Sequence, residues 1–411
     1  MKTLKFNVPC NWDPSLIDEL SIFTNNINYM YGKINSDYFS GGRARCEIKD
    51  ASREQAKEFI KECSRKGIEF NYLINGTYLK NEFSQSNRNK IIKEIEWIEG
   101  LGVKHVTISI PYIARLIKRY FPHIKIVVSI FSHVRSQRQI DFWEEIGADC
   151  ICLDRHLVRN YNKIKQLTGK NNIDLSLLVN DPCILNCGEE LYHDNLMSRA
   201  SLYSSEYSHY CSFTCFYQFL RFPYKIFTAT FIRPEDLYLY SQIGINIFKI
   251  VDRNRTTKFI TNAVKAYSKQ SYEGNLIDLL SIFSSFDRNE NINFNYEQKK
   301  FSLKIADNFW YALPKIVDLF IDNKSMDGFA EKWISTIGSC EDYDCNKCGI
   351  CMDMSANYLR YDQQKIDNAF KCIDKILTAY SDERGHLFRF KKATCYDSKW
   401  PPVPHQRGHP I

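Results

Sequence analysis

Residues 174–187 read Asp174-Leu-Ser-Leu-Leu-Val179 and then Asn-Asp-Pro-Cys183-Ile-Leu-Asn-Cys187. The first half is strongly apolar, as expected for a short strand that is buried in a parallel sheet. The second half is polar, contains a proline and brings two cysteines to the carboxyl end of the strand. Barrels of parallel strands keep their chemistry at that end. This stretch therefore predicts both a fold class and the place of a candidate site.

The first 250 residues repeat the same pattern of a short apolar segment followed by a helical one. Such alternation predicts a parallel sheet with helical crossovers, and eight units in ~250 residues predict an α/β fold closed into a TIM-like (β/α)8 barrel. An open doubly wound sheet is the alternative, although no G-x-G-x-x-G follows the first strand. Besides 174–179, the predicted strands cover residues 4–9, 27–32, 68–75, 104–110, 124–131, 149–154 and 246–251.

The chain changes character after residue 258. Residues 283–297 are polar and rich in asparagine, a composition typical of linkers. Helical segments follow, among them residues 364–380, and the last twelve residues form a proline-rich tail. We therefore predict a barrel over residues 1–270, a linker over 271–300, and a smaller, mainly helical, cysteine-rich C-terminal region over 301–411.

Two groups of cysteines have the spacing of metal ligands. The first consists of two C-x-x-x-C pairs, Cys183 with Cys187 and Cys211 with Cys215. Four thiols can hold either a structural zinc ion or an iron–sulfur cluster, and the spacing leaves both open. The second group has the spacing C-x4-C-x2-C-x2-C, which resembles ferredoxin patterns and predicts a second iron–sulfur cluster, with zinc as the alternative. Its members are Cys340, Cys345, Cys348 and Cys351.

Several predicted strands end in a polar residue. In a barrel these ends converge on one mouth, so together they predict a polar substrate pocket beside the first cysteine group. The alternative for each residue is that it caps the following helix. The residues predicted to line the pocket are Asn75, Ser109, Ser129 and Asn180.

Composition limits the remaining possibilities. The net charge of +7 over 411 residues permits an anionic substrate or RNA but requires neither. No segment approaches the ~20 apolar residues of a membrane span, and the N-terminus lacks a secretory signal, so we expect a cytoplasmic protein. Fifteen cysteines in a reducing compartment indicate metal or redox chemistry rather than disulfides.

One further stretch resembles a known family. Residues 231–237, Phe-Ile-Arg-Pro-Glu-Asp-Leu, are followed by Ile-Gly-Ile-Asn-Ile-Phe-Lys-Ile-Val at 243–251. Together with the Gly-Gly-Arg loop at 41–43, they resemble the collagenase-like peptidase family U-32 over roughly residues 3–280. Lys249, Ile250 and Arg253 match the family's Lys-Ile-Glu-Gly-Arg segment, whereas Val251 and Asp252 replace its Glu-Gly.

The resemblance implies a barrel that carries one 4Fe-4S cluster, with Cys183, Cys187, Cys211 and Cys215 as its ligands. Relatives of this kind are linked to oxygen-independent hydroxylation in ubiquinone synthesis and in RNA modification, with prephenate implicated as a co-substrate. The expected function is therefore an iron–sulfur-dependent oxidoreductase that hydroxylates an organic, nucleobase or peptide substrate. A partner protein is compatible with this function, as is an RNA substrate, although no nucleic-acid motif is present.

Candidate roles for individual residues follow from this hypothesis. Arg233, Lys249 and Arg253 would hold a small anionic co-substrate, because guanidinium groups pair with carboxylates. His193 would donate a proton, and we assign catalytic roles to His193, Lys249 and Arg253. One alternative is a peptidase acting on collagen-like or other peptides, although neither H-E-x-x-H nor G-x-S-x-G is present. Another is a non-catalytic binding protein that is stabilised by zinc.

Overall fold

The computed structural model describes residues 3–79, 84–170, 173–203, 209–281, 303–341 and 343–383. Eight parallel strands form a closed barrel in which β1 pairs with β8. The predicted (β/α)8 barrel is therefore confirmed, and the open-sheet alternative is wrong. The strands are β1 (Lys5–Pro9), β2 (Ile27–Gly32), β3 (Phe70–Ile74), β4 (His105–Ile108), β5 (Lys125–Val128), β6 (Cys150–Cys152), β7 (Asp174–Leu178) and β8 (Ile247–Lys249).

Alternation along the strands separates the barrel interior from its outer shell. In β5, Val127 belongs to a small inner cluster with Tyr29, Tyr31 and Leu73, whereas its neighbours belong to the large core beneath the helices. Successive side chains of a strand point to opposite faces, and in β5 the buried residues 126–128 are apolar on both faces. The strands could be predicted from sequence for this reason.

Helices surround the barrel, and local sequence sets many of their ends. Ser52 and Gln55 form a capping box at the start of α2, and Gly147 ends α5 in the left-handed region at φ 94°. The helices of the barrel part are α1 (Pro14–Leu20), α2 (Arg53–Arg65), α3 (Gln85–Glu99), α4 (Pro111–Tyr120), α5 (Gln137–Ile146), α6 (Tyr161–Thr168), α7 (Glu190–Ala200), α8 (Tyr210–Arg221), α9 (Lys225–Thr228), α10 (Leu237–Gln242) and α11 (Thr257–Lys269).

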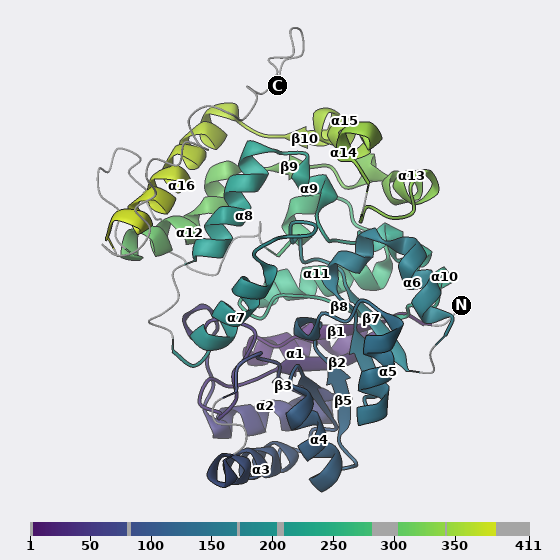
Figure 1. Ribbon diagram of the computed structural model, residues 1–411, viewed down its shortest axis with the longest axis vertical. Helices are drawn as coiled ribbons and strands as arrows, with labels where there is room; N and C mark the ends of the chain where they lie inside the picture. The colour runs from purple at the N-terminus through teal and green to yellow at the C-terminus, as the bar shows by residue number, and fades with distance from the viewer. Residues whose placement is uncertain are drawn as a thin grey trace.

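The C-terminal region packs on the long crossover between β7 and β8. Figure 1 shows α8 of this crossover beside α12 and α16, on one side of the barrel. The region is mainly helical, as predicted, with one short antiparallel strand pair. Its elements are α12 (Leu303–Val317), β9 (Phe320–Ile321), α13 (Phe329–Thr336), α14 (Cys345–Cys348), α15 (Ile350–Tyr358), β10 (Leu359–Arg360) and α16 (Gln363–Glu383).

The predicted linker over 271–300 is described only up to Ser281. Residues 276–279 form a short 3-10 helix with buried leucines, and the Ser281 amide donates to the Asn180 carbonyl at 3.0 Å. This first part of the predicted linker therefore packs on the barrel. Residues 282–302 and the proline-rich tail lie outside the described residues, so the domain boundaries stay a prediction. No helix in the described part of the chain is long and apolar enough to cross a membrane.

Candidate active site and metal centre

The first cysteine group lies at the carboxyl end of β7. Cys183 and Cys187 are in the loop that follows the strand, and Cys211 and Cys215 are one turn apart on α8. The loop is tied to the barrel because the Cys183 amide donates to the Thr230 hydroxyl at 3.2 Å, and that hydroxyl donates to the Asp181 carbonyl at 2.9 Å. The crossover thus brings the two C-x-x-x-C pairs to one place.

The thiols of this group are close enough to influence one another electrostatically. Burial raises the pKa of Cys215, and negative charge on the other three thiols would raise it further. Burial raises the pKa of Cys211 to about 12, with Glu189 and Cys187 adding to the shift. Four neighbouring thiols that resist deprotonation fit a metal centre, because a bound metal provides the positive charge that stabilises thiolates.

A short 3-10 helix, η4 (Arg155–Arg159), supplies partners to the Cys183 loop. Arg155 is buried, ion-pairs with Asp181 at 3.3 Å, and its charge opposes the effect of burial on the Cys183 thiol. The backbone N–H of Asn186 donates to His156 Nδ1 at 3.2 Å. A cation near a thiolate stabilises its negative charge, so Arg155 of η4 favours the thiolate form of Cys183.

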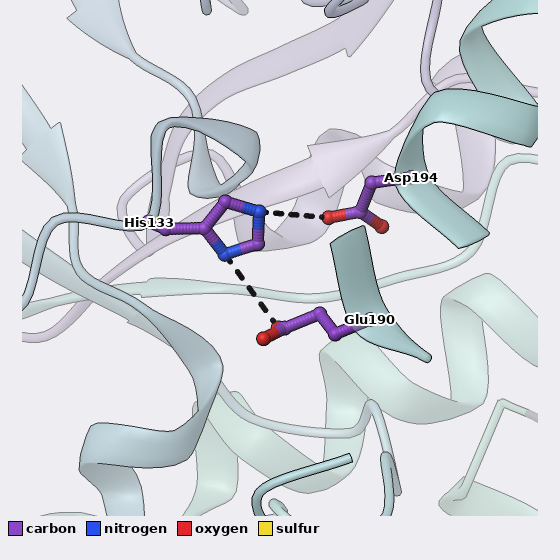
Figure 2. Close-up of side chains that lie close together, drawn as sticks. All are labelled: His133, Glu190 and Asp194. Carbon is purple, nitrogen blue, oxygen red and sulfur yellow. Dashed lines mark ion pairs between the residues drawn. The ribbon is translucent and has the colours of Figure 1, made fainter. Parts of the chain in front are cut away.

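An ion-pair cluster adjoins η4. His133 follows β5, and its ring points between Glu190 and Asp194 of α7, as Figure 2 shows. The distances are 3.7 Å from Nδ1 to Glu190, 3.2 Å from Nε2 to Asp194 and 3.1 Å from Nδ1 to Asp154. Burial opposes the charge on His133, but these carboxylates raise its pKa to about 9. His133 is therefore a cation at neutral pH.

Arginines neutralise the same carboxylates. Arg135 ion-pairs with Asp154 at 2.9 Å and with Glu190 at 2.8 Å, and Arg155 Nε lies 3.3 Å from Glu190. Burial would raise the pKa of Asp154, yet His133, the His156 amide and the nearby charges lower it to about 2. The cluster is thus a network of opposite charges that fixes α7 against η4 and β5.

A second set of charges faces the barrel mouth after β8. Arg43 Nε ion-pairs with Asp252 at 2.7 Å, and Lys249 Nζ lies 4.4 Å from the centroid of the Tyr31 ring. Arg253 is buried beside them. Burial lowers the pKa of Lys249 and of Arg253, and each is also lowered by the charge of Arg43. Three cations around one carboxylate form an environment that favours a bound anion.

His193 lies on α7 near both sets of charges. Burial lowers its pKa to about 4, and the cations Arg155 and Arg43 act in the same direction against the charge of Asp194. The imidazole is therefore neutral at pH 7. Its Nε2 atom is buried and has no hydrogen-bond partner among the described residues. The contribution of His193 to catalysis stays a prediction.

The polar residues at the strand ends mainly hold the backbone together. Ser109 donates to the Asn75 carbonyl at 2.7 Å, and Ser129 caps the short helix that follows β5. The Asn180 side chain donates to the Val251 and Leu279 carbonyls and accepts from the Val251 amide. Of these four residues, Asn75 alone keeps a buried side-chain oxygen for which the described residues provide no partner. A substrate contact of these four residues stays a prediction.

Arg233 serves the C-terminal region. Its buried guanidinium bonds Asp236 at 2.9 and 3.0 Å and donates to the Asn323 carbonyl at 2.7 Å. It also lies 3.3 Å from Asp327. With these partners Arg233 anchors the region after β9 to the barrel, whereas Lys249 and Arg253 remain near the mouth.

Several residues of the site were not singled out from sequence as site residues. They are His133, Arg135, Asp154, Arg155, Glu190 and Asp194, together with Arg43, which was noticed only as part of the Gly-Gly-Arg loop. Asp154 is the last residue of the predicted strand 149–154. The positions of β5, β6 and β7 were the available signal, because polar residues that directly follow barrel strands meet at one mouth.

A closed parallel barrel with four thiols and a charged pocket at its mouth defines a TIM-barrel protein with a candidate metal centre. The model of peptidase family U32 matches residues 38–272, more than half of the chain. The protein therefore belongs to peptidase family U32.

A relative in Methanocaldococcus jannaschii, named as an uncharacterized protease, is 25% identical over 364 residues. The match covers 84% of this chain and 97% of the relative. Among solved structures, a U32 peptidase aligns with a TM-score of 0.47 and 14% identity, covering 61% of this chain and 93% of that chain. A chitinase from Rhizomucor miehei aligns with a TM-score of 0.36 and 10% identity, over 65% of this chain and 99% of that one. The family name and the name of the Methanocaldococcus jannaschii relative agree with the peptidase alternative better than with the redox hypothesis.

Proposed function

We propose that the protein is an iron–sulfur-dependent redox enzyme whose cluster is held at the barrel mouth by Cys183, Cys187, Cys211 and Cys215. The observation that carries the proposal is the meeting of two C-x-x-x-C pairs beside a cationic pocket. A bound 4Fe-4S cluster would supply single-electron transfer. We expect the reaction to be an oxygen-independent hydroxylation, as the family resemblance implies.

The residues of the mouth would bind and orient an anionic co-substrate. Lys249 and Arg253 would pair with its carboxylates, because their burial and mutual repulsion are relieved by a negative charge. Arg43 is held in place by Asp252 and would provide a third cation. His193, which is neutral and whose Nε2 has no partner among the described residues, would accept a proton.

The first test is the metal content after oxygen-free purification. We expect iron and acid-labile sulfide, about four of each for one 4Fe-4S cluster, together with a broad brown absorption. Zinc without iron would overturn the redox function and support the zinc-stabilised binding protein. Peptide hydrolysis without iron would support the peptidase.

The second test concerns the anion site. Prephenate, a dicarboxylate, serves as the probe in calorimetric titrations of the iron-loaded protein. Lys249→Met should weaken its binding by about 1–3 kcal/mol, the usual effect of losing a charged hydrogen bond. Lys265→Met, which removes an exposed lysine of α11, is the matched control and should bind as the unchanged protein does. Equal binding in all three proteins would remove Lys249 from the site.

A peptidase is the second candidate, favoured by the family name and by one structural feature. His133, Glu190 and Asp194 offer ligand atoms within 4.8 Å of one another, as a metallopeptidase centre requires. Against it, both ring nitrogens of His133 face carboxylates, and Arg135 and Arg155 already neutralise those carboxylates. Hydrolysis of gelatin or fluorogenic peptides that EDTA and His133→Asn both abolish would establish this activity in place of the redox one.

A further inference from the structure

The second cysteine group encloses a small cavity of its own. Cys340, Cys345, Cys348 and Cys351 all line it, together with apolar side chains such as Trp333 and Ile350. α14 begins with Cys345 and ends with Cys348, and Gly349 at φ 69° turns the chain so that α15 can follow directly. Four thiols from twelve residues thus face one enclosed space.

A buried cation lies beside the cavity. The guanidinium of Arg159 is 5.4 Å from the centroid of the Trp333 ring, which lines the cavity. Arg159 also donates to the Phe227 carbonyl, which is the acceptor of the Cys351 thiol at 3.6 Å. Its own buried guanidinium donates to the Ala229 carbonyl at 3.1 Å, which fixes the cation beside the cavity. The Cys340 amide donates to the Arg159 carbonyl at 2.7 Å.

The two cysteine groups are neighbours in the fold. Leu185, which lies between Cys183 and Cys187 in sequence, lines the cavity of the second group. Lys225 of α9 is within electrostatic reach of Cys187 and of Cys345. The helix η4 contacts both groups. The Asn186 amide, next to Cys187, donates to His156 of η4 at 3.2 Å, and the Cys340 amide donates to the Arg159 carbonyl at the end of η4 at 2.7 Å. One loop, one lysine and one short helix therefore connect the two sites.

We propose that Cys340, Cys345, Cys348 and Cys351 bind a second iron–sulfur cluster, which exchanges single electrons with the cluster at the barrel mouth. The relay role rests on the proposed function, whereas the second cluster does not. Each transfer oxidises one cluster by one electron and reduces the other by one. A one-electron carrier protein of the ferredoxin class then restores the second cluster. Cys345 is exposed, so this carrier can approach from that side.

The test compares the full chain with a Cys345→Ala/Cys348→Ala variant after anaerobic reconstitution. The unchanged protein should hold about eight irons and the variant about four. Cys372→Ser, a buried cysteine of α16 outside both groups, is the matched control and should keep about eight. Zinc in the second group, or equal iron in the variant and the control, would overturn the second cluster.

A second variant guards against simple misfolding. Cys345→Ser changes only an exposed ligand and creates no cavity. It should keep the circular dichroism of the unchanged protein while altering the electron paramagnetic resonance signal of the dithionite-reduced clusters. An unchanged signal would contradict the assignment of Cys345 as a ligand.

The relay is tested by the rate at which the mouth cluster is reduced. With reduced ferredoxin as donor, the Cys345→Ala/Cys348→Ala variant should be at least about tenfold slower than the Cys372→Ser control, a difference of 1.4 kcal/mol in the barrier. An equal rate would overturn the relay. Cys183→Ala/Cys211→Ala separates the two proposals, since it should retain about four irons in the second group even if the mouth binds none.

Discussion

The two cysteine groups differ in how the chain assembles them. The mouth group joins a loop after β7 to a helix more than twenty residues later, whereas the second group comes from twelve consecutive residues around α14. The mouth group lies among charged residues such as Arg155, Glu189 and Glu190, and the second lies among apolar ones. The comparison teaches that two groups of four cysteines can have different surroundings. Under the proposed function, the first would lie beside a substrate pocket and the second beside an exposed edge.

The largest expected effect is on metal content and turnover, and it distinguishes the mouth group of cysteines from the second group. Cys183→Ala or Cys211→Ala should remove the mouth metal and abolish turnover, because each substitution deletes one of four ligands. Iron in the second group should remain. Metal analysis and the visible spectrum measure both effects, with the buried Cys63→Ala as the control. A Cys183→Ala protein that keeps full activity would show that the mouth cysteines are not the ligands.

The next largest expected effect is a loss of stability when Arg233, which anchors the C-terminal region to the barrel, is removed. Arg233→Ala leaves Asp236 buried without its partner and should lower the free energy of unfolding by about 3–5 kcal/mol. Denaturant titration followed by circular dichroism measures the loss. Arg138→Ala, an exposed residue of α5, should change little. If the two variants unfold alike, the anchor does not join the C-terminal region to the barrel.

The ionic surroundings of the mouth predict a pH dependence of the free energy of unfolding. The pKa of His133 is about 9 in the folded protein and ~6.5 in the unfolded chain. Its ion pairs therefore stabilise the fold fully below about pH 6.5, and this stability is lost as the pH rises through 9, by at most about 3 kcal/mol.

The difference in melting temperature between the unchanged protein and His133→Gln measures this effect. It should be large at pH 6 and small at pH 10. His123→Gln removes an exposed histidine that pairs with Glu99; it is the control and should change the melting temperature little, because exposed ion pairs contribute little to stability. A pH-independent difference would mean that His133 is not charged in the folded protein.

The smallest expected effect is a shift in reduction potential. It tests whether Arg155 and Arg159 of η4 each influence the potential of a different cluster. Arg155→Gln removes a cation near the mouth group and should lower only that reduction potential, by about 1–2 kcal/mol per electron, because the reduced cluster is the more negative state. Arg159→Gln should lower only the potential of the second group. Arg155→Lys and Arg159→Lys keep the charge and serve as controls. Equal shifts of both potentials by either Gln variant would contradict the separation.

The barrel could be predicted from the sequence because the apolar pattern of its strands is local. Buried parallel strands such as β5 need apolar residues on both faces, and that pattern is visible without any tertiary contact. The ligand spacing of both cysteine groups was visible too. The ion-pair cluster was not, because His133, Asp154 and Glu190 come from segments whose approach depends on how the barrel closes.

Roles inferred for single residues depended even more on the fold. Arg233 resembles a carboxylate-binding residue in sequence, yet its guanidinium is bonded to Asp236 and to Asn323. Asn180 ends a strand as predicted, yet its amide holds the backbone of Val251 and Leu279. The chemical type of a residue determines which hydrogen bonds and ion pairs its side chain can form. Its neighbours in the fold determine which of these it does form.

The sequence by itself determined the alternation of strands and helices, the end of β7 as the place of the site, and the two four-cysteine groups. Only the tertiary structure placed Arg155 and Arg159 of one helix beside different groups and brought Leu185 to the wall of the second. The physical reason is that strand patterns and ligand spacings are local, whereas the course of the β7–β8 crossover is set by packing against α12 and α16, far along the chain.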